Sequence, residues 1–297
     1  MAAQSSNPGI PGAIGLSVAE QAAARPHGRL RRNLKITIPA GMLAVIFFLC
    51  FIGPYVFAVP SPTYTNILDA NDPIFSAHHL LGTDQVGYDI WSRILYGGRT
   101  SLEIALAVNA IGLAVGGMFG AVAGYLGGIR DAVMMRCIDV LIAFPAIVLA
   151  IAIAERLGPS EFHVILALSV FSVPAFSRLG RAATLRVREQ TFIVAARLSG
   201  TRTRRILVRH VVPNILPQLM TFMLLGMGIT VVLEGALSFL NLGIPSPAPS
   251  WGNMIANGET VLTAEPRLVL VPSIALFITV LSLNLLGDGL REHWSSR

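Results

Sequence analysis

Apolar residues in this sequence fall into long runs instead of alternating with polar ones. A helix needs roughly 20 apolar residues to cross a hydrocarbon core of about 30 Å. It can do so because it satisfies its own backbone N–H and C=O groups. We predict six spans, the fourth being the shortest, at residues 36–58, 102–127, 133–154, 162–177, 214–239 and 268–287.

The composition agrees with this pattern. Of the 297 residues, 54% are hydrophobic and only 13% are charged, whereas a soluble domain carries about 25% charged residues. The sequence therefore predicts an all-α membrane protein with six transmembrane helices.

Basic residues gather on one side of the predicted spans. Seventeen of the 22 lie in the two terminal segments and in the second and fourth loops, and four lie in the opposite loops. Lys and Arg concentrate on the cytoplasmic side of membrane proteins, so we predict a multi-pass plasma membrane protein with both termini in the cytoplasm. Topology accounts for the net charge of +6, and we expect no nucleic acid partner.

Glycines in the second span and prolines inside three spans predict where helices pack closely and where they bend. Glycine recurs at every fourth position from Gly112 to Gly128, which predicts a helix face that a neighbour approaches closely, either for tight packing or for sliding. Pro145, Pro174 and Pro272 lie inside spans, where each removes a backbone hydrogen bond and favours a kink.

Catalytic motifs are absent from the sequence. Its single lysine, Lys35, lies outside any Gly-Lys-Ser/Thr phosphate cradle, and its six histidines are not at metal-ligand spacing. An intramembrane aspartyl protease would need Asp139 and Asp288, but the glycines beside Asp288 are typical of a helix end. We expect no enzyme activity, no metal site and no cofactor in this chain.

Two acids lie deep in predicted spans, where a charge is costly and usually faces protein or water. Glu234 and Asp139 are candidates for a translocation path. Alternatively, Glu234 bonds to a neighbouring helix, and Asp139 pairs with Arg136 one turn earlier.

The loop at residues 178–213 holds nine arginines and a single acid, Glu189. Gly200 divides its second half into two short helices. Three arginines would share one helix face and three aliphatic residues the other; the two sets are Arg202, Arg205 and Arg209, and Leu207, Val208 and Val211. Such a helix either lies on anionic lipid or docks into a cytoplasmic partner.

The segment "AARLSGTRTRRILVRHVVP" resembles the EAA loop of ABC importer permeases, in which Glu-Ala-Ala is followed by three residues, Gly, nine residues and Ile-x-Leu-Pro. The family has Glu, Ile and Leu where this chain has Val194, His210 and Val212. In that family the loop is the coupling helix, which enters a cleft of the ATPase subunit. The resemblance assigns residues 194–213 to this loop and gives as coupling residues Ala195, Ala196, Arg197, Gly200, Arg205, His210 and Pro213.

Three further segments narrow the family. They read "LGTDQVGYDIWSRILYGGRTSL", "LSFLNLGIPSPAPSWGNMI" and "VPSIALFITVLSLNLLGDGLRE", and they resemble the second membrane subunit of dipeptide and oligopeptide permeases, with Tyr88 where Arg is usual. The resemblance covers nearly all of residues 35–293. It implies the type I ABC importer transmembrane fold and import of di- or oligopeptides. One alternative is that the same architecture imports nickel, glutathione or haem. Another is that the chain is a passive channel or a membrane scaffold.

The resemblance also implies partners and a domain division. The partners are a homologous permease subunit, two ABC ATPase subunits carrying ATP and Mg, an extracytoplasmic peptide-binding protein, and membrane lipid. Candidate contacts with the binding protein are Pro247, Pro249, Trp251 and Asn253. We divide the chain into a mostly disordered cytoplasmic tail at 1–35, a first span with its extracytoplasmic loop at 36–101, and a permease core at 102–297.

Overall fold

The structure, a computed structural model, describes residues 25–76 and 79–295. The predicted tail up to residue 24 lies outside the described residues, and a helix already occupies the rest of it. Within the described part of the chain there are isolated β-bridges and no strands. The helices are α2 (Arg25–Phe47), α3 (Gly53–Val56), α4 (Ile90–Ile111), α5 (Met118–Leu126), α6 (Gly128–Ile142), α7 (Ala146–Leu157), α8 (Glu161–Arg188), α9 (Thr191–Leu198), α10 (Thr203–Ile206), α11 (Val212–Phe239), α12 (Trp251–Glu259) and α13 (Arg267–Ser295).

Five helical stretches of the described chain are long and apolar enough to cross a membrane. Short π-helical turns join α2 to α3, α4 to α5 and α10 to α11 into continuous stretches. The five are Leu34–Val56, Ile90–Leu126, Glu161–Arg188, Thr203–Phe239 and Arg267–Trp294. They account for all the predicted spans except the third.

The third predicted span is broken. α6 and α7 meet at an angle of 75°, and Pro145 is the N-cap of α7. Proline lacks the N–H that would continue the helical hydrogen bonds, so the expected kink at this residue is confirmed as a full break. Pro174 and Pro272, by contrast, lie inside continuous helices.

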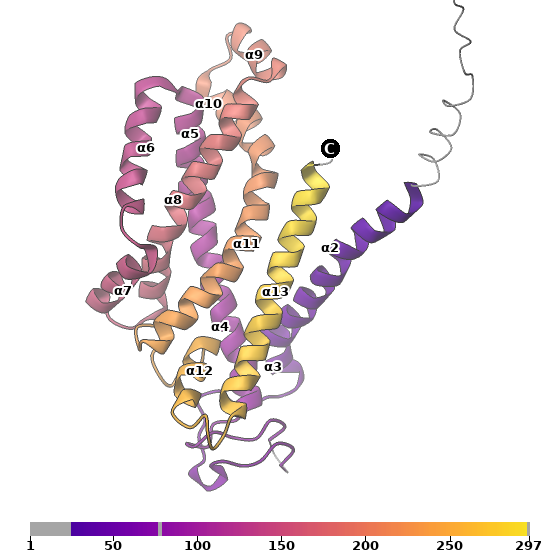
Figure 1. The fold of residues 1–297 in the computed structure, drawn as a ribbon, viewed down its shortest axis with the longest axis vertical. Coiled ribbons are helices and arrows are strands. Elements are labelled where there is room, and N and C mark those ends of the chain that lie inside the picture. Colours follow the sequence, from indigo (N-terminus) through magenta and orange to yellow (C-terminus); the bar gives the residue numbers. More distant parts are fainter. Residues whose placement is uncertain (1–24, 77–78, 296–297) are drawn as a thin grey trace, which may run out of the picture.

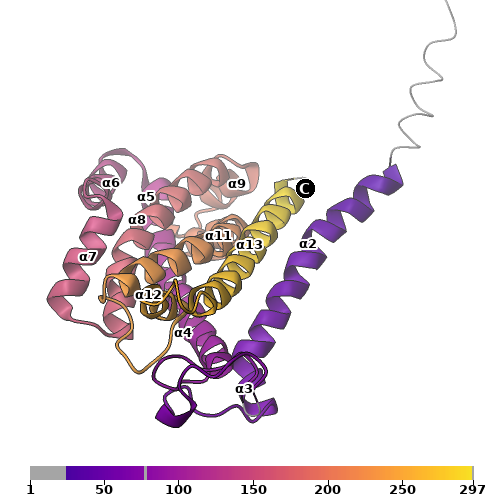
Figure 2. The same ribbon diagram turned by 60° about the horizontal axis from the view of Figure 1, so that its bottom comes forward.

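The helices form an elongated bundle whose two ends differ (Figure 1). α9 lies at one end, which is the end that the distribution of basic residues predicts to be cytoplasmic. The long loop, residues 57–89, lies at the other end. α4 begins at Ile90, so twelve residues of the predicted loop 59–101 belong to a helix. Figure 2 shows α2 at the edge of the bundle opposite α6 and α7.

The glycine face, which belongs to the π-helical turn Gly112–Gly117 and to α5, packs directly on α8. A Cβ on Gly116 would lie 2.3 Å from the carbonyl oxygen of Val173, and one on Gly120 would lie 2.0 Å from that of Ser177. Only glycine permits this approach of two helix backbones. The prediction of close packing is confirmed for this face as far as Gly124, whereas Gly128 has open space around it.

Candidate functional site

The arginine segment, residues 191–213, consists of α9, a turn at Gly200, α10 and the π-helical turn that leads into α11. Gly200 has a φ of +73°, in the left-handed region where glycine ends helices at little cost. Its N–H donates to the carbonyl of Arg197 (3.1 Å), and that of Thr201 donates to Ala196 (3.1 Å). The predicted break at Gly200 is therefore confirmed.

The underside of the segment is fixed to the bundle by apolar packing. Ile193, Ile206 and Val211 are fully or almost fully buried, in a cluster with Tyr125 of α5 and Phe176 of α8. α9 is therefore connected to the spanning helices through packed side chains.

One part of the predicted aliphatic face is wrong. Leu207 and Val211 are buried as expected, but Val208 is 57% exposed. The chain forms a π-helical turn over Leu207–Val211, and the wider turn changes which residues share a face. A 3.6-residue period does not predict this shift.

The upper surface of the segment is open and strongly positive. Leu198, at the end of α9, is 85% exposed, and beyond it lies a hollow of about 1010 Å³. Its lining residues are Ser199, Gly200, Thr201, Arg202, Arg204, Arg205, Val208, Arg209 and Pro213. Among the described residues none of these four arginines has an ion-pair partner. An exposed apolar tip beside unpaired arginines is suited to a protein partner.

The remaining coupling candidates lie outside the lining of this hollow. Ala195 is exposed, and Ala196 packs against the buried cluster. The Arg197 guanidinium lies 5.6 Å from the centre of the Tyr125 ring, within cation–π range. The His210 ring lies 6.5 Å from that of Phe192.

Glu234 is enclosed by hydroxyl groups. Its side chain has no exposed surface, and it accepts hydrogen bonds from Ser101 of α4 (3.1 Å) and Ser238 of α11 (2.7 Å). Ser101 in turn accepts the N–H of Trp251 at the start of α12 (3.3 Å). This arrangement matches the alternative in which Glu234 bonds to a neighbouring helix.

Asp139 does not pair with Arg136. Its carboxylate accepts a hydrogen bond from Arg178 of α8 at 2.8 Å, and the two side chains remain 44% and 55% exposed. One turn along α8, Arg181 forms a two-pronged ion pair with Asp131, at 2.6 and 2.7 Å. Pairs between helices so distant in sequence have no local signature, and sequence reasoning missed both.

Most of the residues expected to contact a binding protein are not at the surface. Trp251 is 1% exposed and donates its indole N–H to the carbonyl of Ile94 (3.0 Å). Asn253 is buried and donates to the carbonyl of Ile244 (2.9 Å), and Pro249 is buried as well. Pro247 alone of the four is exposed. A tryptophan near a predicted span end suggested an interface position, but here it fills the space beside Gly98.

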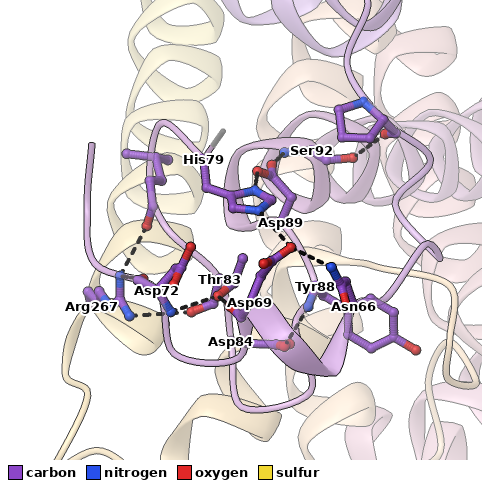
Figure 3. Close-up of polar contacts among 12 residues, drawn as sticks. Asn66, Asp69, Asp72, His79, Thr83, Asp84, Tyr88, Asp89, Ser92 and Arg267 are labelled. Atoms are coloured by element: carbon purple, nitrogen blue, oxygen red, sulfur yellow. Dashed lines mark hydrogen bonds and ion pairs between the residues drawn. The ribbon is translucent and has the colours of Figure 1, made fainter. Parts of the chain in front are cut away.

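The long loop is held together by polar contacts (Figure 3). Asp89 caps α4 by accepting the N–H of Ser92 (2.6 Å) and also contacts the His79 ring (2.6 Å). Arg267, at the start of α13, donates to the carbonyls of Asp72 (2.7 Å) and Thr83 (3.3 Å). Within residues 25–76 and 79–295, no three His, Cys, Asp or Glu side chains gather as metal ligands.

Comparison with known proteins gives the chain a family. Residues 116–297 match the family described as binding-protein-dependent transport system inner membrane component. The glutathione transport system permease protein GsiD of Pectobacterium atrosepticum is 37% identical over 88% of each chain. The dipeptide transport system permease protein DppC of Alkalihalophilus pseudofirmus is 39% identical over 73% of this chain and 71% of its own.

A solved structure supports the fold. The chain resembles one from inward-facing conformations of the MetNI methionine ABC transporter, with a TM-score of 0.56 at 16% identity, covering 67% of this chain and 94% of that one. The likeness confirms the predicted type I importer fold.

Proposed function

The chain belongs to the ABC importer permeases of the peptide family, and from this premise we propose that it forms half of a translocation pathway for peptides and is driven through its arginine segment. The observation that carries the proposal is the combination at Gly200: a left-handed turn with nothing within 4 Å of a Cβ position, beside a hollow lined by four arginines. Gly200 and the four arginines lie at the surface of the bundle, where an ATPase subunit can contact them.

The partners follow from the same reasoning. A second, homologous permease subunit completes the pathway, and two ABC ATPase subunits dock on the arginine segments and hydrolyse ATP with Mg. A peptide-binding protein docks at the opposite end, on the long loop and the exposed Pro247. The arginine-rich end and both termini then lie in the cytoplasm, consistent with the distribution of basic residues.

The substrate class is a short peptide. The relatives with 37% to 40% identity are named for glutathione and for dipeptides, and both kinds of molecule are short peptides with a free ammonium group and a free carboxylate. Import of glutathione is the second candidate, favoured by the number of relatives with that name. Nickel and haem have no support among the relatives described above.

Copurification tests the assembly. The tagged chain is extracted gently from its native membrane, and the proteins that accompany it are identified. We expect a second permease and P-loop ATPases with the wild-type chain, and loss of the ATPases from the Gly200→Asp variant. A lone chain that conducts solutes without ATP would instead indicate a passive channel.

Uptake tests the substrate. The copurified complex is placed in proteoliposomes with ATP and its binding protein, and uptake of a labelled dipeptide is compared with that of labelled glutathione. Uptake of either one that depends on ATP supports a peptide importer, and the ratio of the two rates separates the candidates.

A further inference from the structure

The break between α6 and α7 is an unusual feature for a membrane span. It leaves the last carbonyls of α6 and the first N–H groups of α7 without helical partners. Backbone of this kind at membrane depth is tolerated only where protein buries it or where it lines a water-filled cavity. Broken spans are also frequent at the substrate sites of transporters, so the surroundings of this break are a reasonable place for a binding site.

Two hollows lie beside α6 and α8, and one of them is at the break. One, of about 390 Å³, is mainly apolar and lies between α6, α7 and α8. The other, of about 370 Å³, lies nearer the arginine-rich end and is lined by Ala132, Met135, Asp139, Arg178 and Arg181. Arg178 lines both hollows, so they are neighbours, and we refer to the two together as the groove. Small-molecule sites have volumes of about 300–1,000 Å³, and each of the two hollows is within this range.

The groove has one apolar part and one charged part. The apolar part presents Phe144 and Phe171, which are 58% and 40% exposed. The charged part presents the ion pair of Asp139 and Arg178. Arg178 lies about 15 Å from the arginine-rich end of α8, counting its residues at the helical rise. The pair is therefore within the bundle and not at its tip.

The exposure of this ion pair limits what can cover it. A charged side chain facing hydrocarbon costs at least about 2.5 kcal/mol at the bilayer centre, and both partners here are about half exposed. The neighbouring pair of Arg181 and Asp131 contrasts with it, because the Asp131 side chain is only 11% exposed. Both pairs join α6 to α8, but only the pair of Asp139 and Arg178 keeps a large exposed surface on both of its charges.

We propose that this groove is a binding site for the transported peptide. The ammonium group of the peptide pairs with Asp139, its terminal carboxylate pairs with Arg178, and an apolar side chain occupies the hollow beside Phe144 and Phe171. This inference rests on the proposed peptide substrate. Binding replaces one internal ion pair by two ion pairs with the ligand, so no charge is left unpaired in either state. Such an exchange gives weak, reversible binding, as a transport path requires.

Photolabelling of the complete importer tests the proposal. The copurified complex in lipid nanodiscs, without ATP, is exposed to a dipeptide that contains p-benzoylphenylalanine and has free termini. A matched probe has an acetylated amino terminus and an amidated carboxyl terminus. We expect the free probe to label residues 141–149 and 167–178 at least fivefold more than the capped probe, and an unlabelled dipeptide to compete. This comparison uses the wild-type chain and does not depend on the folding of a variant.

Variants identify the groups involved. Asp139→Asn and Arg178→Gln should each lower labelling at least fivefold. The matched control is Glu103→Gln, because Glu103 and Arg99 form an ion pair of similar exposure on α4; its labelling should equal that of the wild type. Equal labelling by both probes would mean that lipid or another apolar ligand occupies the groove. Labelling confined to the partner permease would mean that this subunit covers it. Either result overturns the proposal.

The uptake assay separates this inference from the proposed function. If the same preparation imports no peptide with ATP, the proposed function fails. If it imports peptide but the groove is not labelled, the function stands and only the binding site is wrong.

Discussion

The two ends of the bundle use their arginines in opposite ways. At the long-loop end, Arg267 is largely buried and donates to backbone carbonyls of the loop and to Glu265. At the arginine-rich end, the arginines around Gly200 line an open hollow and have no ion-pair partner among the described residues. A charge whose hydrogen bonds are satisfied within the chain stabilises the fold, whereas an unpaired, exposed charge is available to a partner.

The sharpest test of this contrast is Gly200→Asp. We expect uptake by the importer to be nearly abolished while the isolated chain loses only on the order of 1 kcal/mol of stability, the cost of placing Asp at the positive φ of Gly200, because its Cβ meets no atom within 4 Å. Uptake and the detergent melting temperature are measured together. The matched control is Gly158→Asp, since Gly158 also has a positive φ and open space but joins α7 to α8. Equal loss of uptake in both variants would show that backbone strain, and not docking, is responsible.

Removing a guanidinium at the long-loop end should instead loosen the fold. Arg267→Ala leaves several part-buried oxygens without donors, which costs roughly 2–4 kcal/mol. The rate of proteolytic cleavage within residues 57–89 measures this loosening. Arg156→Ala, an exposed arginine at the end of α7, serves as the control and should leave the rate unchanged. A loop that stays resistant in Arg267→Ala would contradict the assigned role of these contacts.

Neutralising arginines that line the hollow beside Gly200 should weaken binding of the ATPase subunits without affecting the fold. The triple variant Arg202→Gln, Arg205→Gln, Arg209→Gln is expected to retain its melting temperature. It should bind the ATPase subunits about tenfold more weakly, which corresponds to a loss of about 1.4 kcal/mol in binding free energy. Affinity is measured by titrating the ATPases onto the detergent-solubilised chain.

A second triple variant controls for net charge in that experiment. Arg130→Gln, Arg186→Gln, Arg291→Gln removes the same charge from exposed positions outside the hollow. Equal weakening in both triples would indicate a general electrostatic attraction, and no weakening in either would exclude the arginines from docking.

The smallest effect is expected for an exposed pair within one helix. Arg99 and Glu103 lie four residues apart on α4 at 2.9 Å, with side chains 37% and 40% exposed. Exposed pairs of this type contribute about 0.2–1 kcal/mol. Glu103→Gln should therefore lower the melting temperature by no more than a few degrees, and a larger fall would show that the pair is coupled to the packing of other helices.

Much of the fold could be predicted from local patterns. Apolar runs identified the spans, and the glycine repeat identified the face that packs on α8. The break at Gly200 followed from a single glycine in a polar, charged segment. The sequence did not predict the extent of α8, which continues to Arg188, because its last turns are charged and a hydropathy run ends before them. It also did not predict that α4 begins at Ile90, where the cap by Asp89 starts the helix ahead of the apolar run.

The candidate sites were predictable to different degrees. The segment around Gly200 carries a motif, and the fold holds that motif at the end of the bundle. The burial of two candidate contacts with the binding protein was not predictable, because Trp251 and Asn253 are amphipathic or polar in type yet are buried in the structure. Burial depends on which helices pack over a residue, and neither side-chain chemistry nor distance along the chain reports that.

The sequence by itself determined the spans, their charge asymmetry and the position of the interruption at Gly200, since each depends on residues close together in the chain. Only the tertiary structure decided which charges meet. Asp139 pairs with Arg178, 39 residues away, instead of Arg136, and Glu234 meets Ser101 across 133 residues. These pairings depend on how α4, α6, α8 and α11 are rotated and aligned when they pack. That arrangement is set by the fit of whole helix surfaces and not by any local run of residues.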